Sequence, residues 1–174
     1  MAPPTIAKGL PFTSQGVNRN RGYMMIHAMA RDIWYEGIMQ NYFDLLTSLG
    51  RGVHFVILPD GQVIQHAPIT RRLWHARGAN WDSVGVELLV EGVYDLGALY
   101  SKINKNTAAF DVYSRGQYDG LLSIMDYLVE KDYVKSPYFN WDTHQSQSGG
   151  RKQDPGNSFD FATWNEMLRL QYGE

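Results

Sequence analysis

Short apolar or alternating segments recur along the chain, each bounded by Gly, Pro, Asn or Asp, and this pattern is typical of β-strands. They predict strands over residues 23–28, 53–58, 62–66, 84–90 and 138–143. Pro59-Asp60-Gly61 separates the second and third strands, and this tripeptide favours a tight turn because proline sets φ at the first corner and glycine accepts a positive φ. These two strands are therefore expected to pair as a hairpin.

Three other segments repeat their apolar residues at helical spacing. They are residues 41–49, residues 115–131 and a C-terminal segment that begins after Asn157 or Ser158. Ser114 lies directly before the second segment and Gln117 lies in its first turn. Their spacing is that of a capping box, which marks the start of a helix. The buried side of the last helix is expected to carry Phe161, Trp164, Leu168 and Tyr172.

Strands mixed with helices, and a hairpin among the strands, indicate an α/β (mixed α+β) fold with a central mixed β-sheet flanked by helices. The length of 174 residues predicts a single domain over residues 1–174. Residues 1–21 are rich in Pro, Gly, Ser and Asn, which predicts an N-terminal arm lying over the surface. Residues 92–113 have weak periodicity and are predicted to form a long loop, a kind of segment that often has a function.

Charge and composition narrow the classes of function. The chain has 16 basic and 18 acidic residues, so it lacks the broad positive field that holds nucleic acid or an anionic membrane. Because it has no cysteine, disulfides are impossible and any metal site must use histidine and carboxylate. No membrane-length apolar stretch or export signal is visible, which predicts a soluble protein made in the cytoplasm. A signal removed before this sequence begins would leave it unchanged, so secretion stays open.

The segment from His144 to Asp154 contains the most informative chemistry, because a histidine and a carboxylate flank a loop that carries Lys152. This is the pattern of half a zinc site. His27, at the end of the apolar residues 23–26, is the expected other half, since a buried strand would deliver its imidazole to an edge of the sheet. Two imidazoles and one carboxylate leave a fourth position for water, as in hydrolytic rather than structural sites.

Each of these residues taken alone has a more ordinary explanation. A histidine in an apolar segment is more often a core residue, an aspartate in Asp-Pro-Gly more often caps a turn, and most lysines are solvated. Lys152 and Asp154 are two residues apart, however, so on an extended loop both side chains would face the same site. A fixed cation at Lys152 could stabilise an oxyanion.

Glu87 is a charged residue in an otherwise aliphatic strand, and its burial without a partner would be costly, so a partner or a function must explain it. Among the remaining histidines, we expect a structural role for His54, which lies beside Phe55 on a predicted core strand. His66, near the end of the hairpin, is expected to be exposed. His75 fits a substrate contact at the rim of a site about as well as a structural role. The five tryptophans favour a core over a cofactor site.

The order of these residues resembles the zinc-dependent N-acetylmuramoyl-L-alanine amidases of the type 2 family, which includes peptidoglycan recognition proteins and some phage lysozymes. The resemblance extends from about residue 23 to residue 164. Its landmarks are Ile26-His27, His54-Phe55, Asp60-Gly61, Trp74-His75-Ala76, residues 83–87, His144, residues 151–156 and Phe159-Asp160-Phe161.

The resemblance implies a mixed sheet flanked by helices, a catalytic Zn²⁺, and cleavage of the amide between N-acetylmuramic acid and the first L-alanine of the stem peptide. His27, His144 and Asp154 fall at the zinc-ligand positions of the family. Some members have a cysteine as the third ligand, whereas this chain has Asp154 there.

The resemblance also implies roles for residues around the metal. Glu87 falls at the position of the catalytic acid/base, and Lys152 at that of the residue that stabilises the oxyanion. Trp74, His75 and Arg151, which belong to the landmarks, are assigned to substrate binding.

Two departures from the family pattern affect these roles. Gln145-Ser146-Gln147-Ser148 replaces an Asp-Ile-Ala-Pro type of segment, which changes the local substrate contacts. Some relatives have a catalytic tyrosine where this chain has Val53, so Glu87 must supply that function.

The expected function is therefore that of a monomeric lytic amidase, of the kind that phages use as endolysins, with intact sacculi and muropeptides as substrates and neither nucleic acid nor membrane as a partner. Three alternatives remain. One is a recognition module that binds peptidoglycan without cutting it, another is a cytosolic amidase that recycles muropeptides, and the third is a phage lysozyme that also binds a host protein.

Overall fold

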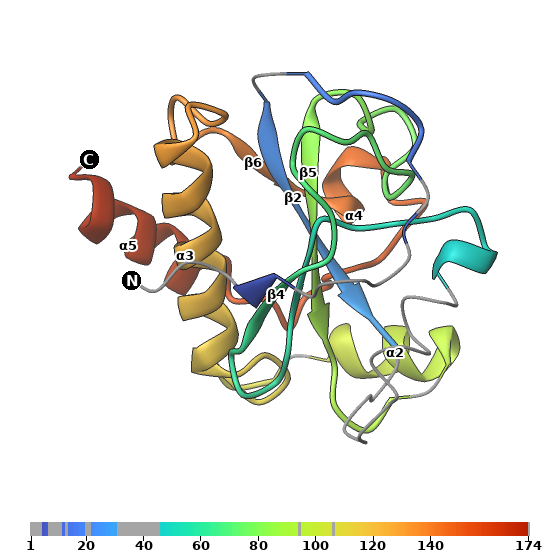
Figure 1. Ribbon diagram of the computed structural model, residues 1–174. Helices are drawn as coiled ribbons and strands as arrows, with labels where there is room; N and C mark the ends of the chain where they lie inside the picture. The colour runs from blue at the N-terminus through green and yellow to red at the C-terminus, as the bar shows by residue number, and fades with distance from the viewer. Residues whose placement is uncertain are drawn as a thin grey trace.

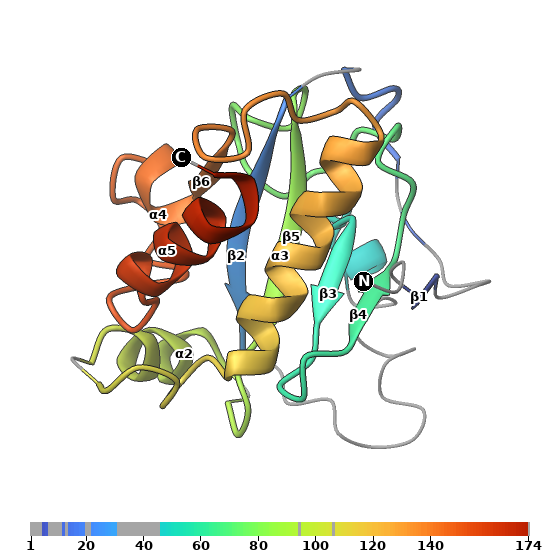
Figure 2. The ribbon, with the colours of Figure 1, turned by 90° about the vertical axis from the view of Figure 1, so that its left-hand side faces the viewer.

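The computed structural model describes residues 5–6, 12, 14–19, 22–30, 46–93, 95–105 and 107–173. Its centre is a six-stranded sheet in the order β1-β4-β3-β5-β2-β6 (Figures 1 and 2). The strands are β1 (Thr5–Ile6), β2 (Tyr23–Met29), β3 (Phe55–Ile57), β4 (Val63–Gln65), β5 (Ser83–Leu89) and β6 (Trp141–Thr143). Only the β3–β4 hairpin is antiparallel within this sheet, which confirms the predicted mixed sheet and its hairpin.

Two long helices cover one face of the sheet. Figure 2 shows α3 (Arg115–Glu130) and α5 (Phe161–Tyr172) in front of the strands. The predicted capping box is present at the start of α3, where the Ser114 hydroxyl accepts from the Gln117 amide and the Gln117 side chain accepts from the Ser114 amide. The short helix α4 (His144–Gln147) lies on the other side of β2 (Figure 1), and α2 (Leu96–Ile103) follows β5.

The alternation of side chains along the central strands separates the core from the site. On β2, Met24 and Ile26 are fully buried in the main core with residues of α3 and α5. On β5, Val84 and Val86 are fully buried in the same core. Because successive side chains of a strand point to opposite faces, His27 points away from this core. Figure 1 shows α4 on the opposite face, where the described residues form no long helix, and His27 and Glu87 point to this face.

One prediction from weak periodicity was wrong. Residues 92–113 are not one long loop, because α2 begins within them, with Asp95 as the N-cap accepting from the Ala98 amide. The part of residues 1–21 that the structure describes is more than a surface arm. β1 pairs in parallel with β4 and so covers part of the outer edge of that strand. The Asn18 side chain is buried.

The other element predictions were mostly right, with shifted ends. The predicted strand at residues 138–143 begins only at Trp141, and α4, which follows it, was not predicted. Residues 46–48 are helical, as expected for the helix over residues 41–49, whose first part lies outside the described residues. No described helix is long and apolar enough to cross a bilayer.

Two expectations about exposure were wrong. His66 is buried, because its imidazole is turned inward and its Nδ1 lies 3.2 Å from the Val53 carbonyl oxygen. The tryptophans do not all belong to the core: Trp164 is fully buried, whereas Trp74 and Trp81 are 55% and 56% exposed. Apolar composition alone does not separate a core indole from one on the surface.

Candidate active site

Neighbouring strands bring the predicted metal ligands together. β6 pairs with β2 so that Thr143 lies opposite Ile26, and His144 therefore follows β6 beside His27. Thr143 turns the chain here, because its hydroxyl accepts from the Ser146 amide and caps α4. After α4 the chain returns, and the Gln145 amide donates to the Asp154 carbonyl oxygen at 2.8 Å, which places Asp154 against both histidines.

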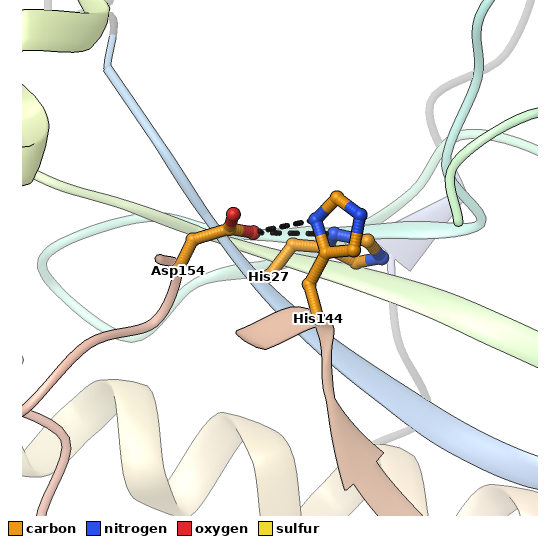
Figure 3. Close-up of side chains that lie close together, drawn as sticks. All are labelled: His27, His144 and Asp154. Atoms are coloured by element: carbon orange, nitrogen blue, oxygen red, sulfur yellow. Dashed lines mark hydrogen bonds and ion pairs between the residues drawn. The ribbon is translucent and has the colours of Figure 1, made fainter. Parts of the chain in front are cut away.

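The three side chains form a compact group. Figure 3 shows the Asp154 carboxylate facing both imidazoles, with its Oδ2 at 3.0 Å from His144 Nδ1 and 3.4 Å from His27 Nδ1. One ligand atom from each residue lies within 4.8 Å of the other two, and all three residues are buried. The arrangement matches the two-histidine, one-carboxylate donor set of a divalent metal site.

The electrostatics of this group suit metal ligands. Burial lowers the pKa of His27, which keeps its imidazole neutral. Burial acts to raise the pKa of Asp154, but hydrogen bonds with His144 and His27 outweigh it and lower that pKa below its usual value. A neutral imidazole beside an ionised carboxylate is the protonation state that metal binding requires.

Glu87 lies next to the metal group. It is directly opposite His27 in the β2–β5 register, so the two side chains share one face of the sheet. Burial, and then the charge of Asp154, raise its pKa well above the usual value, while Lys152 and Arg51 act to lower it. Its buried Oε2 has no hydrogen-bond partner among the described residues. A carboxylate with an unpaired buried oxygen and a raised pKa is a frequent feature of catalytic acids and bases.

A cavity of about 690 Å³ adjoins this group, and every residue that the sequence analysis assigned to the function lines it. These residues are His27, Trp74, His75, Glu87, His144, Arg151, Lys152 and Asp154. Arg51 and Arg77 also line the cavity. The sequence analysis did not identify them, because nothing in their local sequence distinguishes them from solvated arginines.

His54 lies beside the cavity but is held entirely by the backbone, as its predicted structural role requires. Its Nδ1 accepts from the Gly85 amide at 3.0 Å, and its Nε2 lies 2.8 Å from the Arg71 carbonyl oxygen. Burial lowers the pKa of His54 to about 4.

Tyr113 is a further residue that the sequence did not mark. Its buried hydroxyl donates to the carbonyl oxygen of Pro155 at 2.7 Å, directly after Asp154, and so holds the ligand loop against the core. Its segment has weak periodicity, which gave no signal for this contact.

Comparison with known proteins places these residues in a family. The family model described as "N-acetylmuramoyl-L-alanine amidase" matches residues 18–157. The 1,6-anhydro-N-acetylmuramyl-L-alanine amidase AmpD of Citrobacter freundii is 27% identical over 135 residues, which cover 73% of this chain and 62% of the relative. The chain thus spans less than two thirds of the length of this curated relative.

Solved structures share the fold. The solution structure of Citrobacter freundii AmpD aligns with a TM-score of 0.60 and 19% identity, covering 99% of this chain and 94% of that one. The endolysin N-acetylmuramoyl-L-alanine amidase LysCS from Clostridium intestinale aligns with a TM-score of 0.61 and 16% identity, covering 98% and 96%. At these identities the two structures support the architecture rather than a substrate.

Proposed function

Because the chain belongs to the N-acetylmuramoyl-L-alanine amidase family, we propose that it hydrolyses the amide bond between N-acetylmuramic acid and the first L-alanine of peptidoglycan. The observation that carries the proposal is the convergence of His27, His144 and Asp154 in a cavity that also contains Glu87. A site of this kind joins a metal centre to a carboxylate that has an unpaired oxygen, the two groups that amide hydrolysis needs.

Zinc is the metal we assign to this site, with His27, His144 and Asp154 as its ligands. The donor atoms lie within 4.8 Å of one another, and two nitrogens with one oxygen and no thiolate form a catalytic rather than a structural zinc set. When bound there, zinc supplies a Lewis acid that polarises the substrate carbonyl and lowers the pKa of water.

Glu87 is the proposed general acid and base. Its pKa is raised towards neutral pH, and a carboxyl group whose pKa lies near the working pH both accepts and returns a proton efficiently. In the forward reaction Glu87 accepts a proton from the attacking water. It then donates this proton to the departing nitrogen of the alanine, and so avoids the release of an unprotonated amine.

Positive and aromatic side chains around the cavity complete the proposal. Lys152 supplies a cation that stabilises the negative charge on the carbonyl oxygen during attack. Arg151 offers a fork of donors to a carboxylate of the stem peptide. The half-exposed indole of Trp74 offers a flat surface for the sugar, and His75 forms part of the wall of the cavity.

Purified protein, analysed for zinc and incubated with a muropeptide, tests the function. We expect about one zinc per chain and release of the free stem peptide, detected by chromatography, with loss of activity in a chelator and recovery when zinc is restored. Tight muropeptide binding without any peptide release would instead indicate a recognition module and would refute the proposed hydrolysis.

The form of the substrate is a separate proposal. The name of the AmpD relative specifies 1,6-anhydro-N-acetylmuramyl-L-alanine, which favours soluble anhydro-muropeptides and a recycling role. The expected cleavage of intact sacculi, as by an endolysin, stays a prediction. Rates on soluble anhydro-muropeptide and on purified sacculi distinguish the two, and gel filtration of the same preparation tests the expected monomer. A higher rate on sacculi would refute the recycling role.

A further inference from the structure

A chain of hydrogen bonds runs from the proposed ligand His27 to the protein backbone. His27 Nε2 lies 3.0 Å from His75 Nδ1, and the other nitrogen of His75, Nε2, lies 3.4 Å from the hydroxyl oxygen of Ser83. That hydroxyl in turn lies 2.5 Å from the carbonyl oxygen of Ala79. The four groups thus connect the metal centre to a fixed acceptor of the main chain.

The direction of donation along this chain follows from its last member. The Ala79 carbonyl can only accept, so the short contact uses the proton of the Ser83 hydroxyl. Ser83 Oγ is then left as an acceptor for His75, which must carry its proton on Nε2. A neutral His75 with that proton has a lone pair on Nδ1 and accepts from His27 Nε2. With a metal bound, His27 would consequently have its lone pair on Nδ1, the nitrogen that faces Asp154, and the ion would replace the hydrogen bond between these two side chains.

The sheet beneath His75 is shaped to hold its ring. Gly85 lies under the imidazole, and a Cβ at this glycine would meet ring atoms of His75 at 2.7 Å, closer than real contacts allow. Ser83, Gly85 and Glu87 occupy alternate positions of β5 and therefore share one face. The same strand face thus carries the acceptor for His75, the seat for its ring and the proposed catalytic carboxylate.

We propose that His75 is a positioning residue, which fixes the tautomer and orientation of His27 so that Nδ1 is presented to the metal, and that Ser83 and Gly85 fix His75. This inference rests on the proposed zinc site. Both ring nitrogens of His75 are engaged, so its contact with the substrate is limited to ring carbons. Partners of this kind commonly change metal affinity by about 10- to 100-fold when removed.

The zinc dissociation constant, measured by competition with a chromophoric chelator, tests the role without any substrate. His75→Phe keeps an aromatic ring but removes the acceptor, and we expect about 10- to 100-fold weaker zinc binding. His75→Asn, which can present an amide oxygen near the position of Nδ1, should recover part of the loss. Urea unfolding of each variant confirms that the proteins compared are folded.

Two further variants have matched controls. Gly85→Ala leaves every donor and acceptor in place but pushes on the ring, so zinc binding should weaken, whereas Gly52→Ala, whose Cβ would meet Leu73 at an ordinary 3.6 Å, should leave it unchanged. Ser83→Ala should also weaken zinc binding. Its control is Ser123→Ala, which removes a hydroxyl that likewise donates to a nearby carbonyl, that of Gly120, on α3.

Nitrogen NMR of the zinc-loaded protein reads the tautomer directly. We expect His75 to carry its proton on Nε2, with a coupling across the hydrogen bond between His27 Nε2 and His75 Nδ1. A proton on Nδ1 of His75, or zinc affinity within about threefold of the parent in folded His75→Phe, overturns this inference while leaving the amidase proposal standing, because that change is well below the usual effect. A folded parent that binds no zinc overturns the metal site and this inference together.

Discussion

His54 should make the free energy of unfolding fall in mild acid, by an amount that follows from its pKa. The imidazole is fully buried, and both nitrogens are used by its neutral form, one accepting from the Gly85 amide and the other donating to the Arg71 carbonyl. Protonation would place a second N–H against the Gly85 amide, where a donor would face a donor. Acid therefore acts on a group that lies between β5 and the loop that carries Trp74 and His75.

The sign and size of the effect follow from the pKa of His54, which burial lowers from 6.5 to about 4. The unfolded chain takes up a proton near pH 6.5, whereas the folded chain resists it until about pH 4. The stabilisation is thus complete above pH 6.5 and is lost as the pH falls towards 4. The whole loss corresponds to about 3 kcal/mol, and the part between pH 7 and pH 5 to about 2 kcal/mol.

Urea unfolding of the parent and of His54→Gln, both without zinc, measures this contribution. Glutamine does not titrate, so the variant should be less stable at pH 7, and the difference in unfolding free energy should shrink by about 2 kcal/mol at pH 5. Acid effects from other groups cancel in the difference. A difference that stays constant from pH 7 to pH 5 would refute the reasoning.

Four further substitutions test the site and the core. Glu87→Gln should bind zinc normally but lower kcat/KM by about 100-fold or more, and full activity would exclude Glu87 as the acid/base. Lys152→Ala should lower kcat by about 100- to 1,000-fold, whereas an unchanged kcat would remove its role at the oxyanion. Asp154→Ala should abolish stoichiometric zinc binding in a folded protein, and retained zinc would contradict its assignment as a ligand. Leu121→Ala, at a fully buried position of α3, should lower the unfolding free energy by about 2–5 kcal/mol in urea, and a loss below about 1 kcal/mol would show that the site repacks.

Much of the fold could be predicted from local patterns. The capping box at Ser114 marks the start of α3, and Pro59-Asp60-Gly61 marks the hairpin, because both signals act over a few neighbouring residues. The periodicity that should mark α2 is too short to stand out. β1, with only two residues in the sheet, offers no pattern at all until β4 is present as its partner.

The residues of the candidate site were also predictable, although their geometry was not. His27, His144 and Asp154 stood out because histidines and an aspartate in those settings match a known family. The burial of His66 and the exposure of Trp74 did not follow from composition, since both depend on which neighbours pack against them.

The sequence by itself determined which segments form strands and helices, which faces are apolar and which side chains can bind a metal, because these properties reside in near neighbours. Only the tertiary structure decided that His75 bonds to His27, 48 positions away, with Ser83 behind it and Gly85 beneath it. Such contacts depend on the register of β2 against β5 and on the path of a loop across them. That register reflects the packing of the whole sheet, which no local pattern encodes.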